Sequence, residues 1–344
     1  MASDLCGLHA QVLSSAELSL WARVDGLRRS DLSNDLWRDR TLVKMWAMRG
    51  TLHLFRSDEH PLWRSALSSF AHVPQRSWER YFGVTSGEIE RLLDTIASAL
   101  DGQQLTRQEL AVAVAERHPA PAIREALLHS WGGILKPASY RGVLCFAPGD
   151  GQRVRFTNPR SWLRLDGGRP TPDEATREVI RRFLATYGPT SREELARWWG
   201  AFSASRAEQL VRSLGDEVAP VDVERIPMWA LARHVRRIRA IEPARSVRLL
   251  PGFDPYVIGS TRHSIELMPG DFRARVHRQA GWVSPVLAVD GMLEGVWTWS
   301  RKGARVVVAI EPFRTQPRWV RRGAEAEAER LASFLSAELD LAWS

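Results

Sequence analysis

The first hundred residues alternate apolar and polar positions in short segments with a helical period. Serines precede two of these segments, at Ser14-Ser15 and at Ser30, where they are expected to act as helix N-caps. The predicted helices are residues 16–24, 31–37 and 41–46. Residues 51–55 then alternate as a strand does. Three short helices followed by a β-ribbon is the order of a winged helix, a relative of the helix-turn-helix.

The same order of elements recurs twice further along the chain. Apolar residues at helical spacing predict a long helix over 89–100, and two later segments begin with capping-box pairs, Thr106 with Glu109 and Ser191 with Glu194. The second block continues with a helix at 121–130, a segment at 131–136, and strands at 142–146 and 153–157 around the wing-like turn 148–151. The third block follows a Gly/Pro linker at 167–172, with a helix near 203–214 and a ribbon near 217–231.

Beyond residue 246 the pattern changes to short strands, predicted at 247–250, 282–289, 293–299 and 305–310. Asp290-Gly291 lies between two alternating apolar runs and predicts a tight hairpin. An amphipathic helix is expected over 320–340, with apolar positions at Leu331, Phe334, Leu335 and Leu339. The expected fold is α+β, with three tandem winged-helix domains followed by a β-rich α+β domain around a basic cleft. The predicted domains are 1–100, 101–166, 167–245 and 246–344.

Composition fits an ordinary globular protein, with 344 residues, 44% hydrophobic and 26% charged. No apolar run approaches the ~20 residues that span a bilayer, and the first residues lack the pattern of a secretory leader. Two cysteines, Cys6 and Cys145, are too few for a disulfide framework. We therefore expect a cytoplasmic protein without a membrane partner.

The charge balance narrows the class of partner. The formal net charge is +8, and lysine occurs only at positions 44, 136 and 302, so the excess is carried almost entirely by arginine. Arginine matches phosphate oxygens with two parallel hydrogen bonds and stays charged at any relevant pH. Nucleic-acid binding is one explanation; a codon bias that favours arginine throughout the chain is the other.

The tripeptide His9-Ala10-Gln11 is the strongest candidate for chemistry. In an extended backbone, side chains two residues apart point to the same side, so His9 and Gln11 can reach one small target while Leu8 and Ala10 face the other way. A base and an amide directed at one point can hold a single water molecule. The alternative is a helix-terminal or core histidine that only satisfies a hydrogen bond.

Several strings of residues occur in a recognisable order from position 7 to about 313. They are Gly7-Leu8-His9-Ala10-Gln11, Met48-Arg49-Gly50-Thr51-Leu52-His53, Pro137-Ala138-Ser139-Tyr140-Arg141-Gly142, Leu249-Leu250-Pro251-Gly252-Phe253-Asp254-Pro255-Tyr256, Gly281-Trp282-Val283-Ser284-Pro285-Val286 and Val289-Asp290-Gly291. Together the strings resemble the YcaQ/AlkZ-like winged-helix DNA glycosylases.

This resemblance implies three tandem winged helices around a cleft and excision of N7-alkylated purines, including bulky natural-product adducts and interstrand crosslinks. The catalytic pattern of the family is usually Gln-x-Gln or Gln-x-Asp, and His9-Ala10-Gln11 resembles a His-x-Gln subgroup associated with bulky guanine adducts. Such proteins usually carry a helical segment before the motif, whereas eight residues precede His9 here. We expect either a start that lies upstream or a truncated, poorly active product.

The chemistry of such a lesion suits these two residues. Alkylation at N7 places a positive charge on guanine and weakens its bond to the sugar, so departure leaves an oxocarbenium-like centre. His9 would accept a proton from the attacking water, and the Gln11 carbonyl would orient that water. Monofunctional action is expected because no lysine lies near the motif. No metal or cofactor motif is present, and we expect neither.

Other residues are candidates for contacts with double-stranded DNA. Arg49 and His53 lie on the predicted first ribbon, Lys136, Tyr140 and Arg141 precede the second, and Arg236 and Arg237 belong to the densest basic run. The Asp290-Gly291 hairpin is a candidate probe, with Val289, Met292 and Leu293 as apolar wedges. The alternatives are packing for His53, solvated surface for the cations, a plain tight turn for the hairpin, and a turn role for Asp254.

Two rival classes share these features. A transcriptional regulator with winged helices would bind DNA without chemistry, usually as a dimer on palindromic half-sites. An architectural chromatin protein would bind and bend DNA regardless of damage. The enzyme interpretation predicts instead a monomer whose product depends on a lesion.

Overall fold

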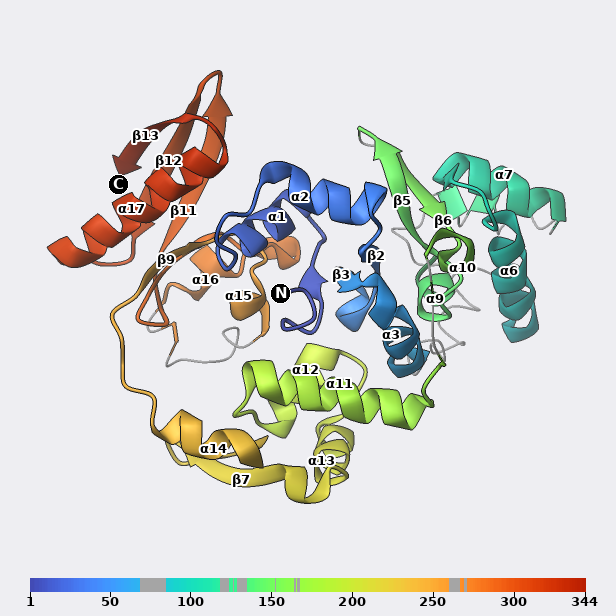
Figure 1. Cartoon of the computed structure of the whole chain (residues 1–344), viewed down its shortest axis with the longest axis horizontal. Coiled ribbons are helices and arrows are strands. Elements are labelled where there is room, and N and C mark those ends of the chain that lie inside the picture. The colour runs from blue at the N-terminus through green and yellow to red at the C-terminus, as the bar shows by residue number, and fades with distance from the viewer. Residues whose placement is uncertain are drawn as a thin grey trace. The chain divides into compact units, whose positions relative to one another are not determined.

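The computed structural model describes residues 1–68, 85–117, 124–125, 127–128, 135–151, 153–163, 165, 168–259, 267–268 and 271–344. Helices and small sheets mix along the chain, as the expected α+β class requires (Figure 1). The chain divides into two compact units. Unit 1 comprises residues 1, 8–33 and 232–344, and unit 2 comprises residues 2–7 and 34–231. Among the described residues, no helix has the length and apolar character needed to cross a bilayer.

Unit 1 is built on a five-stranded sheet with the order β13-β12-β11-β10-β9. Its strands are β9 (Val247–Leu250), β10 (Val286–Val289), β11 (Met292–Lys302), β12 (Arg305–Pro312) and β13 (Glu338–Trp343). Neighbours are antiparallel except β12 and β13, which are parallel. A parallel pair needs a crossover, and α17 (Arg318–Phe334) provides it (Figure 1). The helix buries Val320, Ala324, Ala328 and Leu331 against the sheet.

The remaining elements of unit 1 are short. They are β1 (Leu8–His9), α1 (Leu13–Trp21), α2 (Arg29–Ser33), α14 (Ala232–Arg239), α15 (Pro255–Gly259), α16 (Arg273–Val276) and a 3₁₀ turn (Gln279–Gly281). Helix α1 is fixed to α17 through Trp21. The Arg330 guanidinium lies 4.1 Å from the centre of the Trp21 ring and donates a hydrogen bond of 2.9 Å to the Trp21 carbonyl.

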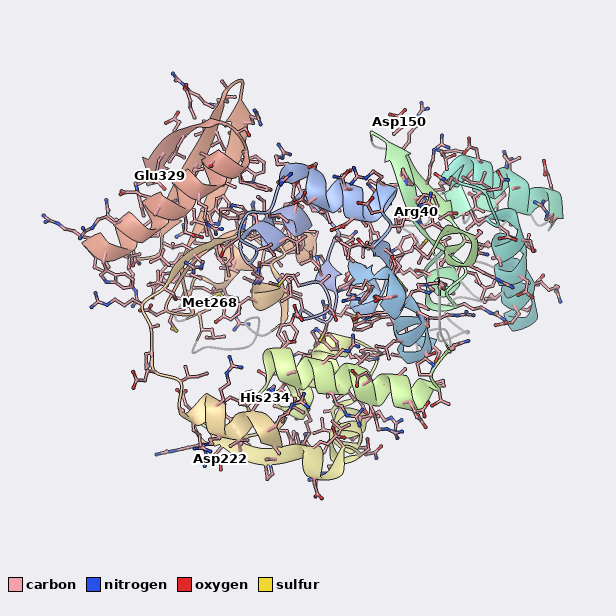
Figure 2. All side chains as sticks on the ribbon, viewed as in Figure 1. Arg40, Asp150, Asp222, His234, Met268 and Glu329 are labelled. Carbon is pink, nitrogen blue, oxygen red and sulfur yellow. The ribbon has the colours of Figure 1, made fainter. Side chains whose placement is uncertain are left out.

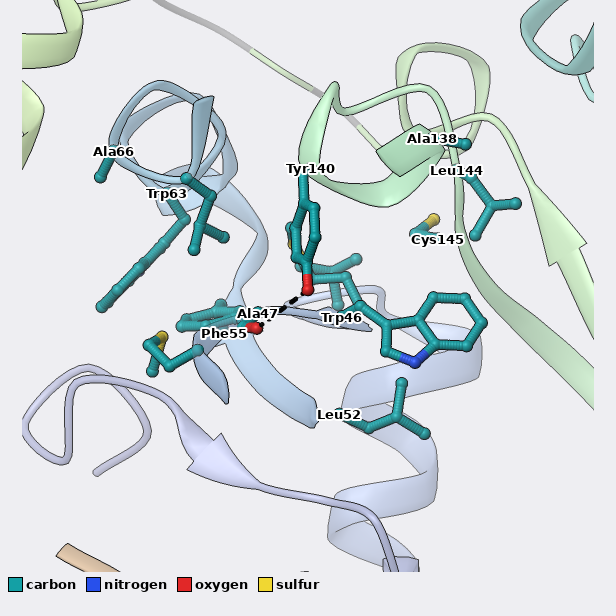
Figure 3. Close-up of a cluster of buried hydrophobic side chains, with 14 of the residues drawn as sticks. Trp46, Ala47, Leu52, Phe55, Trp63, Ala66, Ala138, Tyr140, Leu144 and Cys145 are labelled. Atoms are coloured by element: carbon teal, nitrogen blue, oxygen red, sulfur yellow. Dashed lines mark hydrogen bonds between the residues drawn. The ribbon is translucent and has the colours of Figure 1, made fainter. Parts of the chain in front are cut away.

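The longer segment of unit 2, residues 34–231, begins with a π-helical turn (Asn34–Arg38) and an antiparallel pair, β2 (Leu42–Trp46) and β3 (Leu52–Arg56). Between and after them lie 3₁₀ turns (Met48–Gly50 and Ser57–Glu59) and α3 (His60–Ala66). Buried aromatic rings fill the core between these elements and α9 (Leu135–Tyr140), as Figure 3 shows for Trp46, Phe55 and Trp63. The Trp46 amide donates to the Ser139 hydroxyl at 3.1 Å, which joins β2 to α9.

Two further sections of unit 2 share one order of described elements: a helix, a short strand or bridge, two helices and a hairpin. The first contains α6 (Ser86–Ala99), β4 (Leu105–Thr106), α7 (Arg107–Arg117), α9, β5 (Cys145–Asp150) and β6 (Arg153–Thr157), followed by α10 (Pro159–Trp162). Its sheet has the order β4-β6-β5. The second contains α11 (Pro172–Tyr187), a bridge between Thr190 and Trp229, α12 (Arg192–Trp199), α13 (Ala204–Arg212), a 3₁₀ turn (Gly215–Glu217), β7 (Val218–Val223) and β8 (Ile226–Leu231).

Both predicted capping boxes are confirmed. The Thr106 amide donates to the Glu109 carboxylate at 2.7 Å, and the Glu109 amide donates back to the Thr106 hydroxyl at 3.3 Å. These bonds favour the charged carboxylate and lower the pKa of Glu109. Ser191 and Glu194 form the same reciprocal pair at the start of α12. The helix over 89–100 and the ribbons at 153–157 and 217–231 are also confirmed.

The prediction of a helix over 41–46 was wrong, because this segment is strand β2. Four of its five residues are buried, so both faces of the strand are apolar and periodicity alone does not distinguish it from a helix. The serine caps were also wrong. Val12, without a side-chain cap, precedes α1, and Ser30 lies inside α2 rather than before it.

The closing helix is shorter than expected and ends at Phe334, so Leu339 lies in strand β13. Strand β10 begins at Val286, which leaves Trp282 in the preceding loop, and β5 begins at Cys145 rather than Gly142. The predicted helix at 121–130 falls largely outside the described residues, and of the predicted segment at 131–136 only Leu135 and Lys136 are described, at the start of α9.

Candidate active site

His9 ends the short strand β1 and is buried, with 6% of its surface exposed. Its ring stacks on Phe253, with the ring centres 5.3 Å apart and the planes 16° from parallel. Gly7, just before the strand, has a φ of +91°, and a Cβ there would lie 2.3 Å from Cε1 of Phe55. The glycine of the motif is therefore required both by the backbone turn and by the close approach of that ring.

Gln11 differs from His9 in exposure. Leu8 and Ala10 are fully buried, as expected, whereas Gln11 is exposed and lies in a bend after the strand has ended. The predicted extension is thus confirmed through His9 only. The convergence of the two side chains on one water stays a prediction.

A buried ion pair lies one residue from Phe253 in the sequence. Asp254 is completely buried, and its two carboxylate oxygens accept hydrogen bonds of 2.7 Å from Nη1 and Nη2 of Arg23, which follows α1. Arg23 also donates to the Ser19 carbonyl at 3.0 Å. The Asp254 carboxylate accepts a further bond of 2.9 Å from the Tyr256 amide, which is the expected turn contact. The Asp254 side chain thus serves a turn and an ion pair together.

Phe253 connects His9 to a second aromatic ring. Its backbone has a φ of +60°, an uncommon conformation for a residue with a side chain. On one side it stacks on His9, and on the other it meets Trp282 edge to face, with ring centres 5.0 Å apart at 77°. The Arg23–Asp254 pair fixes the residue next to Phe253 and so supports the ring that contacts the imidazole.

The Asp290-Gly291 turn is confirmed as a hairpin between β10 and β11, with φ values of +51° and +83°. It is also tied to its own unit. The Asp290 carboxylate accepts from the Ser246 amide at 2.6 Å, and the Gly291 carbonyl accepts from the Tyr256 hydroxyl at 2.7 Å. Val289 and Leu293 are buried, so among the expected apolar wedges only Met292 is partly exposed.

Helix α14 carries the densest basic run of the chain (Figure 2, near the label of His234). Arg236 and Arg237 are exposed, and within the described residues no ion pair joins either of them to a carboxylate. Unneutralised exposed cations of this kind are available to phosphate groups.

In unit 2, Arg49 is built into the fold. It has a φ of +57°, and its guanidinium donates to the Trp198 carbonyl. Burial lowers the pKa of Arg49 to about 10, so it remains charged at neutral pH. A Cβ on Gly200 would lie 2.9 Å from the Cα of Arg49, which shows how closely α12 approaches this residue.

His53 and Tyr140 are also interior residues of unit 2. His53 is 2% exposed, with its Nδ1 3.2 Å from the Thr51 carbonyl oxygen and its ring stacked on Phe55. Tyr140 donates a long hydrogen bond of 3.5 Å to the Ala47 carbonyl, drawn as the dashed line in Figure 3. Burial raises the pKa of the Tyr140 hydroxyl. These contacts favour the packing alternative for both residues.

The other two candidates of unit 2 are more accessible. Lys136 is half-buried, and burial lowers the pKa of its ammonium. Arg141 forms an ion pair with Glu90 and lies 4.0 Å from the Asp94 carboxylate, with 36% of its side chain exposed. A phosphate contact by Arg141 would compete with two carboxylates.

The described residues contain no group of three histidine, cysteine, aspartate or glutamate side chains arranged to hold a metal ion. Both cysteines are buried as free thiols, and burial raises the pKa of Cys6 to about 12. Neither thiol is activated as a nucleophile.

Sequence reasoning missed Arg23 and the exposed position of Trp282. Arg23 is separated from Asp254 by 231 positions, and no local pattern connects them. Trp282 belongs to one of the strings that carried the resemblance, but its exposure of 49% is a property of the folded chain.

Comparison with known proteins identifies the class of this enzyme. The model of the family described as "DNA glycosylase AlkZ-like" matches residues 2–334, so the chain belongs to the AlkZ-like DNA glycosylases, which hydrolyse N-glycosyl bonds. It is 37% identical over 332 residues to an interstrand DNA cross-link repair glycosylase of Streptomyces sahachiroi, covering 95% of this chain and 88% of that protein. The solved structure of the DNA glycosylase AlkZ of Streptomyces sahachiroi matches with a TM-score of 0.90 at 34% identity, covering 100% of this chain and 92% of that one.

Proposed function

We propose that this protein is a monofunctional glycosylase that removes N7-alkylated guanine, including bulky or crosslinked adducts, from duplex DNA in the cytoplasm. The observation that carries the proposal is the family match over residues 2–334, which includes His9-Ala10-Gln11. The name of the Streptomyces sahachiroi relative, an interstrand cross-link repair glycosylase, supports the choice of crosslinked lesions. Family membership also favours an enzyme over a regulator or an architectural protein.

In the proposed mechanism the lesion supplies its own leaving-group charge. The positive charge on the alkylated base weakens its bond to the sugar, and water attacks the anomeric carbon as the base departs. His9 accepts the proton of that water, while the Gln11 carbonyl orients it. The stack of His9 on Phe253 holds the imidazole plane, and the exposure of Gln11 gives its amide access to substrate and solvent. A fixed base and an accessible amide are the two parts that the mechanism needs.

We further propose that unit 2 contains winged helices. In their described residues, the sections from α6 to β6 and from α11 to β8 each run helix, short strand or bridge, two helices and hairpin. Strand β4 pairs with β6 in the first, and Thr190 bridges to Trp229 of β8 in the second. Their hairpins would act as wings on the DNA backbone. The first of the three expected winged helices lacks this support, because residues 42–46 form a strand.

DNA contacts are assigned according to exposure. Arg236 and Arg237 are proposed as phosphate contacts, and so are the half-buried Lys136 and Arg141, which is already paired with Glu90. The exposed Asp290 and the half-buried Gly291 form a turn that can pack against DNA without inserting Val289 or Leu293. For Arg49, His53 and Tyr140, a direct contact with DNA requires a side chain already used in packing, and we propose that they support the fold.

The test is release of a damaged base. The full chain is incubated with a duplex that carries one 7-methylguanine, and with the same duplex lacking the lesion. Free 7-methylguanine is measured by mass spectrometry and abasic sites by alkaline cleavage. We expect base release and alkali-labile sites from the damaged duplex only. Absence of free base from the methylated duplex and from a bulky N7-guanine adduct would contradict the proposed function.

A further inference from the structure

Among the described residues, Trp282 is the one exposed large hydrophobic side chain that carries an aromatic ring. Its exposed fraction is 49%. In the described part of the chain, the other large apolar side chains with comparable exposure are aliphatic: Met1, Val112, Val154, Val223, Ile226 and Ile241. An exposed indole leaves a large flat apolar surface in water, which stacking with a planar partner would cover.

Backbone hydrogen bonds close a tight turn just before Trp282. The Arg278 amide donates to the Trp282 carbonyl at 2.8 Å, and the Trp282 amide donates to the Gln279 carbonyl at 3.3 Å. Ala280 and Gly281 complete the turn with φ values of +56° and +74°. The next residue, Val283, is buried and bridges to His277. A rigid turn presents the indole with little conformational entropy left to lose on binding.

Trp282 is connected to the candidate active site through one ring. Its indole meets Phe253 edge to face at 5.0 Å, and Phe253 stacks on His9 at 5.3 Å. All three residues belong to unit 1. The exposed indole therefore continues the row of rings that begins at the proposed general base.

The same turn carries an exposed cation. Arg278 is exposed, and within the described residues it forms no ion pair with a carboxylate. Arg275, three positions earlier, is paired with Glu311 at 2.5 Å and is therefore already neutralised. A flat aromatic surface beside an unneutralised arginine is the combination by which proteins hold a nucleobase and its phosphate.

We propose that Trp282 is the platform on which a flat aromatic part of the damaged DNA stacks. Two groups share the required chemistry, namely the N7-alkylated purine itself and a planar aromatic adduct attached to it. The identity of this substrate rests on the function proposed above, whereas the stacking surface rests on the geometry of unit 1. Trp282 thus contributes to lesion recognition, and His9 and Gln11 to hydrolysis.

Binding to a stable lesion tests this role without requiring catalysis. One duplex carries 2′-fluorinated 7-methylguanosine, in which the fluorine slows loss of the base, and a second carries a polycyclic aromatic group at N7 of the same nucleotide. The affinity of the full chain is measured by fluorescence anisotropy at one fixed salt concentration. The variants are Trp282→Ala, Trp282→Leu and Trp282→Phe. Ile241→Ala is the matched control, because Ile241 is 66% exposed in the same unit and has no ring.

We expect Trp282→Ala and Trp282→Leu to weaken binding to a damaged duplex on the order of 10-fold, which is the usual effect of losing one stacked base. Trp282→Phe restores part of the affinity, and Ile241→Ala leaves it unchanged. A loss on both duplexes identifies the purine as the stacked group, and a loss on the bulky duplex alone identifies the adduct.

Equal affinity of all variants for both damaged duplexes would overturn the proposal, and so would an equal loss on the lesion-free duplex. Because binding uses lesions that resist hydrolysis, a failure of the wild-type chain to release 7-methylguanine refutes the proposed function separately. Unfolding of each variant by denaturant shows whether its fold is intact.

Discussion

Units 1 and 2 use the same kinds of polar side chain in opposite ways. In unit 2, Arg49, His53 and Tyr140 are bound to backbone carbonyls or stacked inside the core. In unit 1, Gln11, Arg236 and Arg237 are exposed, and the buried His9 adjoins a row of rings that reaches the surface at Trp282. Residue type alone does not separate architecture from chemistry. Exposure and existing hydrogen bonds separate Arg236 and Arg237 from Arg49 and Tyr140, whereas His9 and His53 are both buried and both stacked on a phenylalanine ring.

The largest expected effect on stability comes from the ion pair between Arg23 and Asp254, the residue that follows Phe253. Arg23→Ala leaves the fully buried Asp254 carboxylate without its bidentate partner, and we expect the free energy of unfolding to fall by about 3 kcal/mol or more. Asp254→Ala should cost less, about 1–2 kcal/mol, because Arg23 is 20% exposed and can turn to water. Urea unfolding of the full chain measures both.

We thus predict that Arg23→Ala lowers the free energy of unfolding more than Asp254→Ala does. If Asp254→Ala destabilises unit 1 more than Arg23→Ala, the turn bond to Tyr256 rather than the ion pair is the main contribution of Asp254. Asp254→Asn is the matched control, because an amide oxygen still accepts the Tyr256 bond.

We expect a comparable fall in the free energy of unfolding when the pH is lowered, because of a histidine in unit 2. His60 is buried, and burial, with a smaller contribution from Arg64, lowers its pKa to about 4. Since the unfolded chain binds a proton near pH 6.5 and the folded chain does not, stability is complete above pH 6.5 and decreases below it. We expect a loss of about 3 kcal/mol between pH 7 and pH 4 from this residue.

The variant His60→Leu cannot titrate at this position and isolates that contribution. Its unfolding free energy should decrease less steeply than that of the wild type over the same pH range. Parallel pH profiles for the two proteins would show that His60 is protonated in the folded chain.

The smallest expected effect is on the salt dependence of DNA binding, when two exposed arginines of unit 1 are replaced. Arg236→Ala with Arg237→Ala should reduce the slope of log affinity against log salt by ~2, with little change in stability. Arg38→Ala with Arg56→Ala is the control, because both arginines are already paired with aspartates, Asp39 and Asp58. If the slope of the Arg236→Ala, Arg237→Ala double variant equals that of the wild type, these two arginines do not contact DNA phosphates.

Local signals in the sequence were sufficient for much of the secondary structure. The capping boxes at Thr106 and Ser191 and the Asp290-Gly291 turn depend on residues three or fewer positions apart, and all three are confirmed. Residues 42–46 are different. Their strand is defined by pairing with β3, and an apolar run buried on both faces has no period that reveals it.

The candidate site was predictable only where it depends on neighbouring residues in the sequence. The extension at His9 is a local property, but the stack on Phe253 joins positions 244 residues apart, which no spacing rule connects. The Arg23–Asp254 pair and the exposure of Trp282 likewise depend on tertiary structure. Asp254 was expected only to form a turn, and its sequence neighbours give no indication of its guanidinium partner.

We propose that His9 and Gln11 together direct one water at the sugar of an N7-alkylated guanine. The most direct measurement is single-turnover release of 7-methylguanine by His9→Ala, Gln11→Ala and His9→Phe, the last of which keeps a ring on Phe253 but has no base. We predict that each variant loses at least about 100-fold in rate, while its affinity for DNA stays close to that of the wild type. Full turnover in both alanine variants would contradict the account.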